Sequence, residues 1–462
     1  MSTAAARRPV RTEIAEGNRD KAAHARRVLI VTFDFPPRRT SAVYRMIGLA
    51  RSLPQLGWQP TVLTVRGLAG AQDPQLLEKL SPDTRIVRTR YLSVNGWEDS
   101  AWNTARKAGA FRAAPNDVRE TPFDRCFRLG GKILRSTLYF PDERVGWAPF
   151  ALARAVQLHR ERKFDLVYTT SPPRTTPVIG MLMKLLFGVP WVSEFMDPWY
   201  PADGRLRRSA DDRLLGRLTH TADRIVVMVP EHAEQLRQQF RLPPEKLAVV
   251  RNGFFEEDFA SLESLPRRSL DAGFVHLGHF GTVYPGNQGL FFEALADLLN
   301  QRPWLGKRLR LHIVGAASEQ VLREVQQDGL REITEIHGFL PHVETLQMMR
   351  ACHCLLLFWG RRDFSRLAVA GKTYEYLRIG RPILAVTSEG GVKQLVQAEQ
   401  AGWVVPPDDI GAIQDALLRA MEMEGHANTA PVRPSKFVAQ FRWDHQAKIL
   451  AETFDEALTY GR

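Results

Sequence analysis

The residues best suited to chemistry are Gly371, Lys372, Thr373 and Glu375, which lie close together in the second half of the chain. Their sequence predicts a loop that opens a short helix. Backbone amides at such a helix start, the positive end of the helix dipole and the Lys372 ammonium group together suit a diphosphate. Glu375 follows one turn later, where a carboxylate can accept hydrogen bonds from both hydroxyls of a ribose. The alternative is a solvated Glu375 that pairs with Arg378.

A second group of candidates follows apolar runs in the first half of the chain. Asp197 and Trp199 come directly after residues 190–195, and Ser171 comes after residues 164–168. A carboxylate beside a Trp that packs on a sugar ring suits hydroxyl recognition or base chemistry. The alternative for Asp197 is to cap the next helix, since Asp is common at such positions.

A third loop, residues 34–39, follows the first apolar run and contains Pro37 and Arg38. The consecutive prolines are also compatible with a rigid turn that has no role in binding. We keep both interpretations, because loops at strand ends often carry functional residues.

These loops are positioned by β-rich apolar runs that alternate with segments of helical periodicity. Such alternation predicts mostly parallel sheets covered on both faces, with ligands bound beyond the carboxyl ends of the strands. The expected strands of the first half are residues 28–33, 60–65, 164–168, 190–195 and 224–229. Those of the second half are residues 276–280, 309–314, 336–340, 354–359, 382–387 and 402–405.

The fold class is therefore α/β, with two doubly wound parallel-sheet domains. We expect a disordered basic tail (1–25), a first domain (26–260) with an insertion at 91–147, a linker (261–272), a second domain (273–436) and a final crossover helix (437–462). Within the insertion, residues 132–138 are expected to be helical.

The composition restricts the class of protein and of partner. The 462 residues are 44% hydrophobic and 25% charged, which is typical of a globular protein. Three cysteines, an odd number, predict no disulfide framework and a reducing compartment. The basic N-terminal tail is followed by no apolar stretch, and no segment reaches the length of a membrane span, so we expect a cytoplasmic protein. The sequence gives no indication of oligomeric state.

The formal net charge of +12 favours anionic partners. The basic stretches are not interleaved with aromatic residues in a reading motif, so nucleic acid is not expected. The excess of Lys and Arg, and the aromatic and basic insertion 91–147 that ends with residues 140–147, suggest docking at an anionic membrane surface on the inner face of the cytoplasmic membrane. The alternative is a surface elaboration of the first domain.

Six motifs carry a resemblance to the family-4 glycosyltransferases. In chain order they are Phe35-Pro36-Pro37, Ser171-Pro172-Pro173, Phe195-Met196-Asp197-Pro198-Trp199, Val250-Arg251-Asn252-Gly253-Phe254, Gly278 to Tyr284, and Gly371-Lys372 to Pro382. The resemblance implies a GT-B fold with a central cleft, a nucleotide-sugar donor bound mainly by the second domain and an acceptor bound by the first. It also implies retention of anomeric configuration without a cofactor or catalytic metal, and the chain contains no Asp-x-Asp pair.

The resemblance and the residue types together define a predicted site. On the donor side we expect Gly281, Thr282, Phe339, Arg366, Gly371, Lys372, Thr373 and Glu375. On the acceptor side we expect Pro37, Arg38 and Trp199, and for catalysis Asp197, Ser171 and Glu375. No residue is expected to bind a metal.

The chain also departs from the family pattern. Leu367 stands where many relatives carry the first of two glutamates, and Thr282, Asn287 and Gln288 stand near the positions of an Arg and a Lys that neutralise the diphosphate. Thr170 or Ser171 stands near the position of a catalytic-site His. Because an uncompensated diphosphate is costly in a cleft, other cations must substitute. The candidates are Lys372, Arg361, Arg362 and Arg366.

The predicted function is transfer of a sugar from a nucleotide diphosphate sugar to a saccharide or lipid-linked saccharide, in polysaccharide or glycan biosynthesis. The alternative is a catalytically impaired nucleotide-sugar-binding or scaffold protein on the same fold. A dinucleotide oxidoreductase is disfavoured, because no G-x-G-x-x-G follows the first strand. A metal site at residues 352–354 is disfavoured too, since Cys352, His353 and Cys354 have no second ligand pair.

Overall fold

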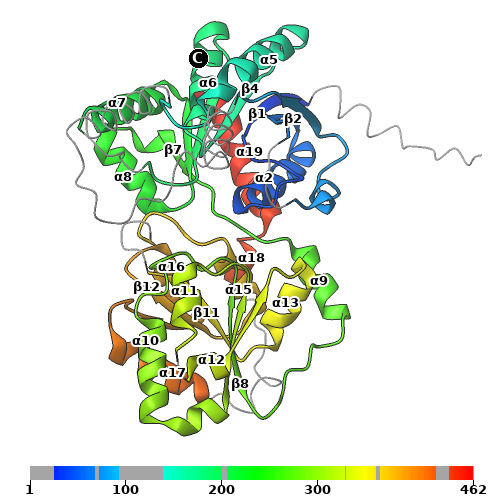
Figure 1. The fold of residues 1–462 in the computed structure, drawn as a ribbon. Coiled ribbons are helices and arrows are strands. Elements are labelled where there is room, and N and C mark those ends of the chain that lie inside the picture. The colour runs from blue at the N-terminus through cyan, green and yellow to red at the C-terminus, as the bar shows by residue number, and fades with distance from the viewer. Residues whose placement is uncertain are drawn as a thin grey trace, which may run out of the picture.

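A computed structural model describes residues 25–67, 72–92, 139–199, 205–327, 329–360, 365–422 and 436–460. The described chain forms two parallel sheets, each covered by helices on both faces, one above the other in Figure 1. None of the described helices is long and apolar enough to span a membrane.

The first sheet has seven strands in the order β3-β2-β1-β4-β5-β6-β7. Their bounds are β1 (Arg26–Val31), β2 (Trp58–Val65), β3 (Arg85–Thr89), β4 (Leu166–Ser171), β5 (Trp191–Phe195), β6 (Arg224–Val227) and β7 (Leu247–Val249). The helices of this half are α2 (Ser41–Ser52), α5 (Ala148–Glu161), α6 (Thr175–Phe187), α7 (Arg205–Thr221) and α8 (Pro230–Phe240). The order reverses between β1 and β4, which places the switch point of the sheet at the ends of these two strands.

The second sheet has six strands in the order β10-β9-β8-β11-β12-β13. Their bounds are β8 (Val275–Phe280), β9 (Leu309–Val314), β10 (Thr334–Gly338), β11 (Cys354–Trp359), β12 (Ile383–Thr387) and β13 (Gly402–Val405). One face packs on α10 (Phe291–Gln301), α11 (Glu319–Glu324), α12 (Leu330–Ile333) and α17 (Ile410–Met421). The other packs on α9 (Glu256–Ser264), α13 (His342–Ala351), α15 (Lys372–Ile379), α16 (Gly391–Ala398) and α18 (Lys436–Ala439).

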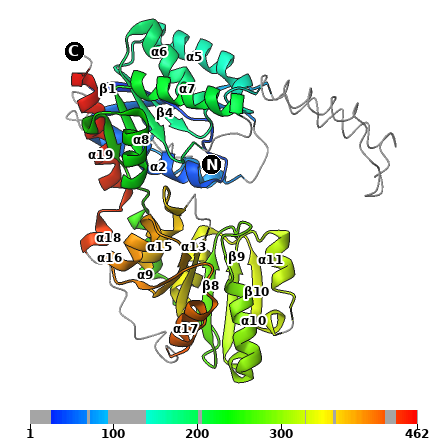
Figure 2. The same ribbon diagram turned by 90° about the vertical axis from the view of Figure 1, so that its left-hand side faces the viewer.

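The chain passes between the two halves twice, and the two passages are hydrogen-bonded to each other. The amide of Phe254 donates to the carbonyl of Phe441, and the amide of Trp443 donates to the carbonyl of Phe254, both at 3.1 Å. After the second passage α19 (Trp443–Tyr460) runs back along the first half beside α2, as Figures 1 and 2 show. The apolar face of α19, with Leu450 and Phe454, is therefore part of the first core.

Several predicted elements differ in detail from the observed ones. The expected final helix is divided, because the chain leaves the helical conformation at Phe441 to pair with Phe254 before α19 begins. The expected linker is helical in its first part, where α9 extends to Ser264. The short edge strands β3 and β7 were not predicted. Both are only partly buried, β3 is interrupted by Arg88, and β7 has only three residues. The N-terminal tail and residues 93–138 of the insertion lie outside the described residues.

Candidate functional site

The helix α15 begins at the carboxyl end of the second sheet, as the sequence predicts. The amides of Thr373 and Tyr374 already donate to the carbonyls of Ala370 and Gly371, at 2.9 and 3.2 Å. The amides of Gly371 and Lys372 are left without a backbone acceptor among the described residues. Fewer backbone amides are therefore available to a diphosphate than the sequence predicts, because the amide of Thr373 is already hydrogen-bonded.

Lys372 reaches from this helix to the end of β8. Its Nζ lies 3.0 Å from Nε2 of His279, whose Nδ1 lies 3.0 Å from the carbonyl oxygen of Leu356. Since that carbonyl only accepts, His279 carries its hydrogen on Nδ1 and accepts from Lys372 at Nε2. The amine also lies 3.1 Å from the position of a Cβ on Gly281, whose φ is +102°. Because Gly281 has no side chain, Lys372 can occupy the space beside it. These two residues, both predicted for the donor site, are therefore in contact.

The environment of Lys372 changes its protonation. Burial lowers the pKa of the amine to about 7, and the nearby carboxylate of Glu375 only partly opposes the effect. About half of the molecules therefore carry an ammonium group here at neutral pH. A diphosphate bound beside the amine would favour the charged form.

Glu375 is held by a histidine that the sequence analysis did not single out. Nε2 of His342, at the start of α13, lies 2.9 Å from Oε1 of Glu375, and its Nδ1 lies 3.4 Å from Oδ2 of Asp258. Asp258 in turn binds Nζ of Lys79 at 2.6 Å. Burial alone would lower the pKa of His342, but the facing carboxylates of Glu375 and Asp258 raise it to about 9. His342 is therefore a cation at neutral pH.

The alternative pairing of Glu375 with Arg378 is wrong. Arg378 points away from the cleft and forms ion pairs with Glu256 and Glu263 of α9. In the sequence, the only sign of this contact is that His342 comes shortly after the predicted strand-end loop with Phe339 and Leu340. Its two partners are 84 and 33 residues away in sequence, so no local pattern contains them.

The first half contacts this region directly. Nη2 of Arg39 donates to the carbonyl of Leu340 at 3.2 Å, and the guanidinium lies 5.6 Å from the ring centre of Phe339. The ring of Tyr44 on α2 lies 6.0 Å from that of His342. Phe339 itself remains 63% exposed, so one face of its ring is available to a ligand. The two halves therefore meet around the carboxylate of Glu375.

Asp197, Ser171 and Trp199 lie together at the ends of β4 and β5. Nε1 of Trp199 donates to Oγ of Ser171 at 3.2 Å, and Arg174 stacks on the Trp199 ring at 4.9 Å. Asp197 caps no described helix, because α7 begins only at Arg205. Burial raises the pKa of the Asp197 carboxyl to about 6. This carboxyl can therefore take up or release a proton near neutral pH.

The loop with Pro37 and Arg38 is tied to its own half of the molecule. Arg38 forms an ion pair with Asp34, and the carbonyl of Pro37 accepts from the amide of Asp73 at 2.6 Å. Arg88 donates to the carbonyl of Pro36 at 2.7 Å. These contacts favour a rigid turn for this loop, and the neighbouring Arg39, rather than Arg38, reaches the second half.

A buried ion pair connects the first sheet to the passage between the halves. Nε of Arg45 on α2 donates to Glu194 of β5 at 2.9 Å, and both side chains are almost fully buried. Arg45 also donates to the carbonyl of Arg251 at 2.8 Å and to the side chain of Asn252 at 3.1 Å. Asn252 in turn lies 3.9 Å from the position of a Cβ on Gly371. Glu194 therefore has a structural role.

The residues that replace the charged residues of the family pattern are uncharged, so they cannot neutralise a diphosphate. Gln288 binds Glu324 at 3.1 Å, and the side chain of Asn287 is buried. Thr282 lies at the end of β8 next to Gly281, and Leu367 is partly buried. Arg366 is exposed, in a loop that packs against Gly390. Arg361 and Arg362 lie outside the described residues. Lys372 is thus the predicted cation whose surroundings best fit a diphosphate.

The cysteine-rich segment has no geometry for a metal. Cys352 belongs to the core on the α13 face of the second sheet and Cys354 to the core on the opposite face. Burial raises the pKa of Cys354 to about 12 and that of Cys352 further, so both remain thiols.

Residues 140–147 do not form an exposed aromatic and basic surface. Trp147 is fully buried, and the guanidinium of Arg144 stacks on Phe33 at 5.2 Å. Asp142 accepts from the amide of Thr175 at 2.8 Å. This segment therefore packs on the first half, while residues 93–138 of the insertion lie outside the described residues.

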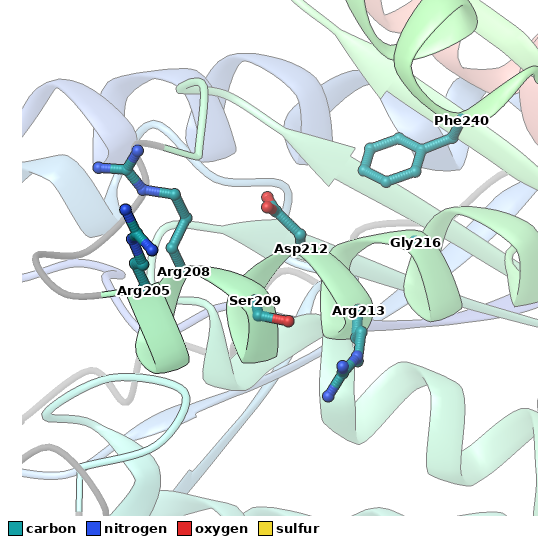
Figure 3. A pocket seen from close by; sticks show the side chains of 7 residues that line it. All are labelled: Arg205, Arg208, Ser209, Asp212, Arg213, Gly216 and Phe240. Carbon is teal, nitrogen blue, oxygen red and sulfur yellow. The ribbon is translucent and has the colours of Figure 1, made fainter.

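A hollow of about 490 Å³ lies elsewhere, on the outer side of α7 (Figure 3). It is lined by Arg205, Arg208, Ser209, Asp212, Arg213, Gly216 and Phe240. None of the residues predicted for the donor or acceptor site lines it.

Each half of the chain matches a family of known protein domains. Residues 42–253 match the glycosyl transferase 4-like domain, and residues 273–423 match the glycosyl transferases group 1 domain. A D-inositol 3-phosphate glycosyltransferase of Streptomyces scabiei is 25% identical over 335 residues, which are 65% of this chain and 70% of that protein.

Solved structures share the fold at low sequence identity. Sucrose-phosphate synthase of Thermosynechococcus elongatus gives a TM-score of 0.58 with 15% identity, over 93% of this chain and 98% of that one. Anabaena HepE, solved in complex with UDP, gives 0.56 with 16% identity, over 94% and 97%. The two family models match consecutive parts of the chain, and the structure has two Rossmann-like sheets and a helix that crosses back to the first half. The chain therefore belongs to the GT-B glycosyltransferases of the family-4 type.

Proposed function

We propose that the protein transfers a sugar from a nucleoside diphosphate sugar to a hydroxyl of a saccharide or lipid-linked acceptor, with retention of anomeric configuration. The observation that carries the proposal is the placement of Lys372 and Glu375 one turn apart on α15, facing Arg39 and Tyr44 of the other half. A cation for the diphosphate and a carboxylate for the ribose thus lie at one junction.

The donor would lie along the start of α15. Its diphosphate would rest on the amides of Gly371 and Lys372, beside the Lys372 amine and Gly281. Its ribose hydroxyls would donate to Glu375, which His342 keeps oriented. Its base would stack on the exposed ring of Phe339, since bases and aromatic rings stack favourably.

The acceptor would lie at the ends of β4 and β5. Its reacting hydroxyl would donate a hydrogen bond to Asp197, and its ring would pack on Trp199. As the new glycosidic bond forms, the hydroxyl would give its proton to the Asp197 carboxylate, the bond from the sugar to the diphosphate would break, and the diphosphate would leave with the electron pair. Lys372 and the helix amides stabilise that charge, and electrostatic stabilisation of this kind is usually the largest catalytic contribution.

The direct test is a screen of nucleotide sugars by thermal shift, followed by a transfer assay with the stabilising donor. UDP-sugars come first, because HepE was solved with UDP. At a hundredfold excess over Kd, one bound donor should stabilise the fold by about 2.7 kcal/mol. The variant Glu375→Ala should lose most of this shift, whereas Glu161→Ala, which changes an exposed glutamate at the end of α5, should keep it.

The same screen separates the enzyme from the scaffold alternative. A donor that binds and is released as free nucleotide in the presence of acceptor supports a transferase. A donor that binds with neither hydrolysis nor transfer, across a panel of saccharides, lipid-linked saccharides and D-inositol 3-phosphate, supports a non-catalytic protein. The last compound is included because of the name of the Streptomyces relative.

A lipid-linked acceptor would bring the protein to the inner face of the cytoplasmic membrane. The support is the basic first part of α7, where Leu206 follows Arg205 in sequence and is 90% exposed. Arg205 and Arg208 line the hollow of Figure 3. An apolar side chain and several cations are the two signals that interfacial binding requires. Co-sedimentation with anionic vesicles at low salt tests this, and loss of binding in Leu206→Asp but not in Leu322→Asp supports α7 as the contact.

A further inference from the structure

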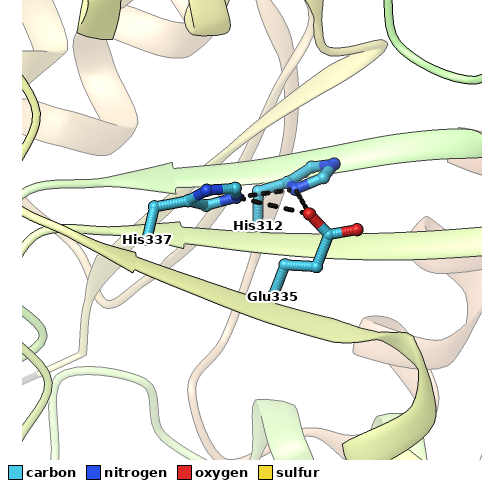
Figure 4. A group of neighbouring side chains, drawn as sticks. All are labelled: His312, Glu335 and His337. Atoms are coloured by element: carbon cyan, nitrogen blue, oxygen red, sulfur yellow. Dashed lines mark hydrogen bonds and ion pairs between the residues drawn. The ribbon is translucent and has the colours of Figure 1, made fainter.

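Two histidines and a glutamate meet at the outer edge of the second sheet. His312 lies on β9, and Glu335 and His337 lie on the neighbouring edge strand β10. Nδ1 of His312 lies 3.1 Å from Nε2 of His337, and Oε2 of Glu335 lies 3.5 and 3.6 Å from these two nitrogens. Figure 4 shows the three side chains pointing toward one another.

The size of this triangle matches the first coordination shell of a metal ion. Zinc binds imidazole nitrogen and carboxylate oxygen at about 2.0–2.2 Å, so two ligands of a tetrahedral site lie ~3.4 Å apart. The three observed separations are 3.1, 3.5 and 3.6 Å, which are close to this value. The side chains would therefore need little movement to bind one ion.

The orientation of His312 is fixed from behind by a chain of hydrogen bonds. The carbonyl of Asp271 lies 2.8 Å from Nε2 of His276, and Nδ1 of His276 lies 2.8 Å from Nε2 of His312. Because the carbonyl only accepts, a neutral His276 carries its hydrogen on Nε2 and accepts at Nδ1. His312 therefore donates from Nε2, and its Nδ1 carries a lone pair on the side where Nε2 of His337 lies at 3.1 Å and Oε2 of Glu335 at 3.5 Å.

Outer hydrogen bonds from the second ring nitrogen are what orients the histidine ligands of metal sites. The backing of His312 by His276 and Asp271 is thus the arrangement that a metal ligand needs.

The local backbone also favours this cluster. The register of β10 against β9 shifts between Ile336 and Gly338, so His337 is the extra residue of a β-bulge. Bulges often re-aim a side chain at a functional position. The side chains of His312, His337 and Glu335 are 2%, 19% and 53% exposed, so the cluster is closed at its base and open to water at Glu335.

The guanidinium groups of Arg268 and Arg310 lie near enough to His312 to act on it electrostatically. Their charges also oppose a metal cation, so we expect an affinity near the micromolar range, on the order of −8 kcal/mol, rather than a permanent site.

We propose that His312, Glu335 and His337 bind one divalent transition metal of the zinc type, with water in the remaining position. The ion would fasten β10 to β9 directly before the loop with Phe339 and Leu340, which contacts Arg39. This site is separate from the proposed donor site, and its existence does not depend on the proposed function.

The test uses the full-length protein after treatment with a chelator. Titration with Co²⁺ should give the visible absorption of a tetrahedral or five-coordinate ion with one equivalent per chain, and Zn²⁺ should displace it. His337→Gln and Glu335→Gln should each weaken binding by at least about tenfold. Both side chains are partly exposed, so the variants are expected to fold, and circular dichroism checks this.

The matched control is His445→Gln, which removes an exposed histidine beside Asp444 on α19. It should bind one Co²⁺ with the affinity of the wild type. The proposal is overturned if the wild type binds no Co²⁺ or Zn²⁺ at 100 µM metal, or if His337→Gln binds as tightly as His445→Gln. If the wild type binds no metal, the contact between the two rings is a hydrogen bond in which Nε2 of His337 donates to Nδ1 of His312.

Discussion

The Lys372 amine makes donor binding depend on pH. Its pKa is lowered to about 7 by burial, so protonation is complete below pH 6 and is lost as the pH rises through 7. If only the ammonium form binds the diphosphate, the donor Kd should rise about 30-fold between pH 6 and 8.5. Calorimetric titration with a nucleotide sugar measures this, because its diphosphate does not titrate in that range.

The matched variant is Lys372→Arg, whose guanidinium stays charged throughout. Its donor Kd should change little between pH 6 and 8.5. Equal pH dependence in the wild type and the variant would assign the titrating group elsewhere.

Asp197 is expected to act on the acceptor rather than the donor. Its carboxyl has a pKa raised to about 6 by burial, so it is mostly ionised at pH 7 and can accept a hydrogen bond from the reacting hydroxyl. Asp197→Asn should lower kcat by about 10²–10⁴-fold and leave the donor KM nearly unchanged. Steady-state kinetics test this, with the exposed Asp83→Asn as the control. An unchanged kcat in Asp197→Asn would remove this carboxyl from the reaction.

At the scale of elements, His342 joins α13 to α9 and α15 through two carboxylates. Its pKa is raised from 6.5 to about 9, so its contribution to stability is complete below pH 6.5 and is lost as the pH rises through 9. His342→Gln should therefore lower the free energy of unfolding by about 2 kcal/mol at pH 6 and by little at pH 10. Urea denaturation at both pH values measures this.

The control for this prediction is again His445→Gln, which should be neutral at both pH values because the side chain is exposed. A destabilisation by His342→Gln that is equal at pH 6 and pH 10 would mean that packing, and not charge, is lost.

The elements of the second half could be predicted well from the sequence, because strands such as β11 and β12 are nearly continuous apolar runs. The helix α15 and the apolar strand β12 that follows it were also predicted, and Gly380 ends α15 at a positive φ. His342 and the buried pair of Arg45 and Glu194 could not be predicted, because their partners come from distant elements. Their geometry depends on how the sheets pack, which no local periodicity contains.

At the scale of the whole molecule, the return of α19 to the first half depends on Gly48 of α2. A Cβ at this position would lie 2.2 Å from Cδ2 of Trp443. Gly48→Ala should therefore destabilise the protein by about 1–3 kcal/mol, although alanine is the better helix former. Gly411→Ala on α17 is the control, because its Cβ would meet only Asp409 at 3.6 Å. Thermal unfolding compares the two, and equal melting temperatures would show that α19 adapts without cost.

The paired passages at Phe254 and Trp443 also restrict how the two halves move. Because the two connecting segments are hydrogen-bonded side by side, sliding or twisting of one half against the other would break both bonds, whereas rotation about the line of the two segments breaks neither. Rotation about this line is therefore the movement that these two hydrogen bonds oppose least. In the proposed transferase, such a rotation would carry a donor on α15 toward an acceptor at the ends of β4 and β5, so the backbone itself would favour one path of approach.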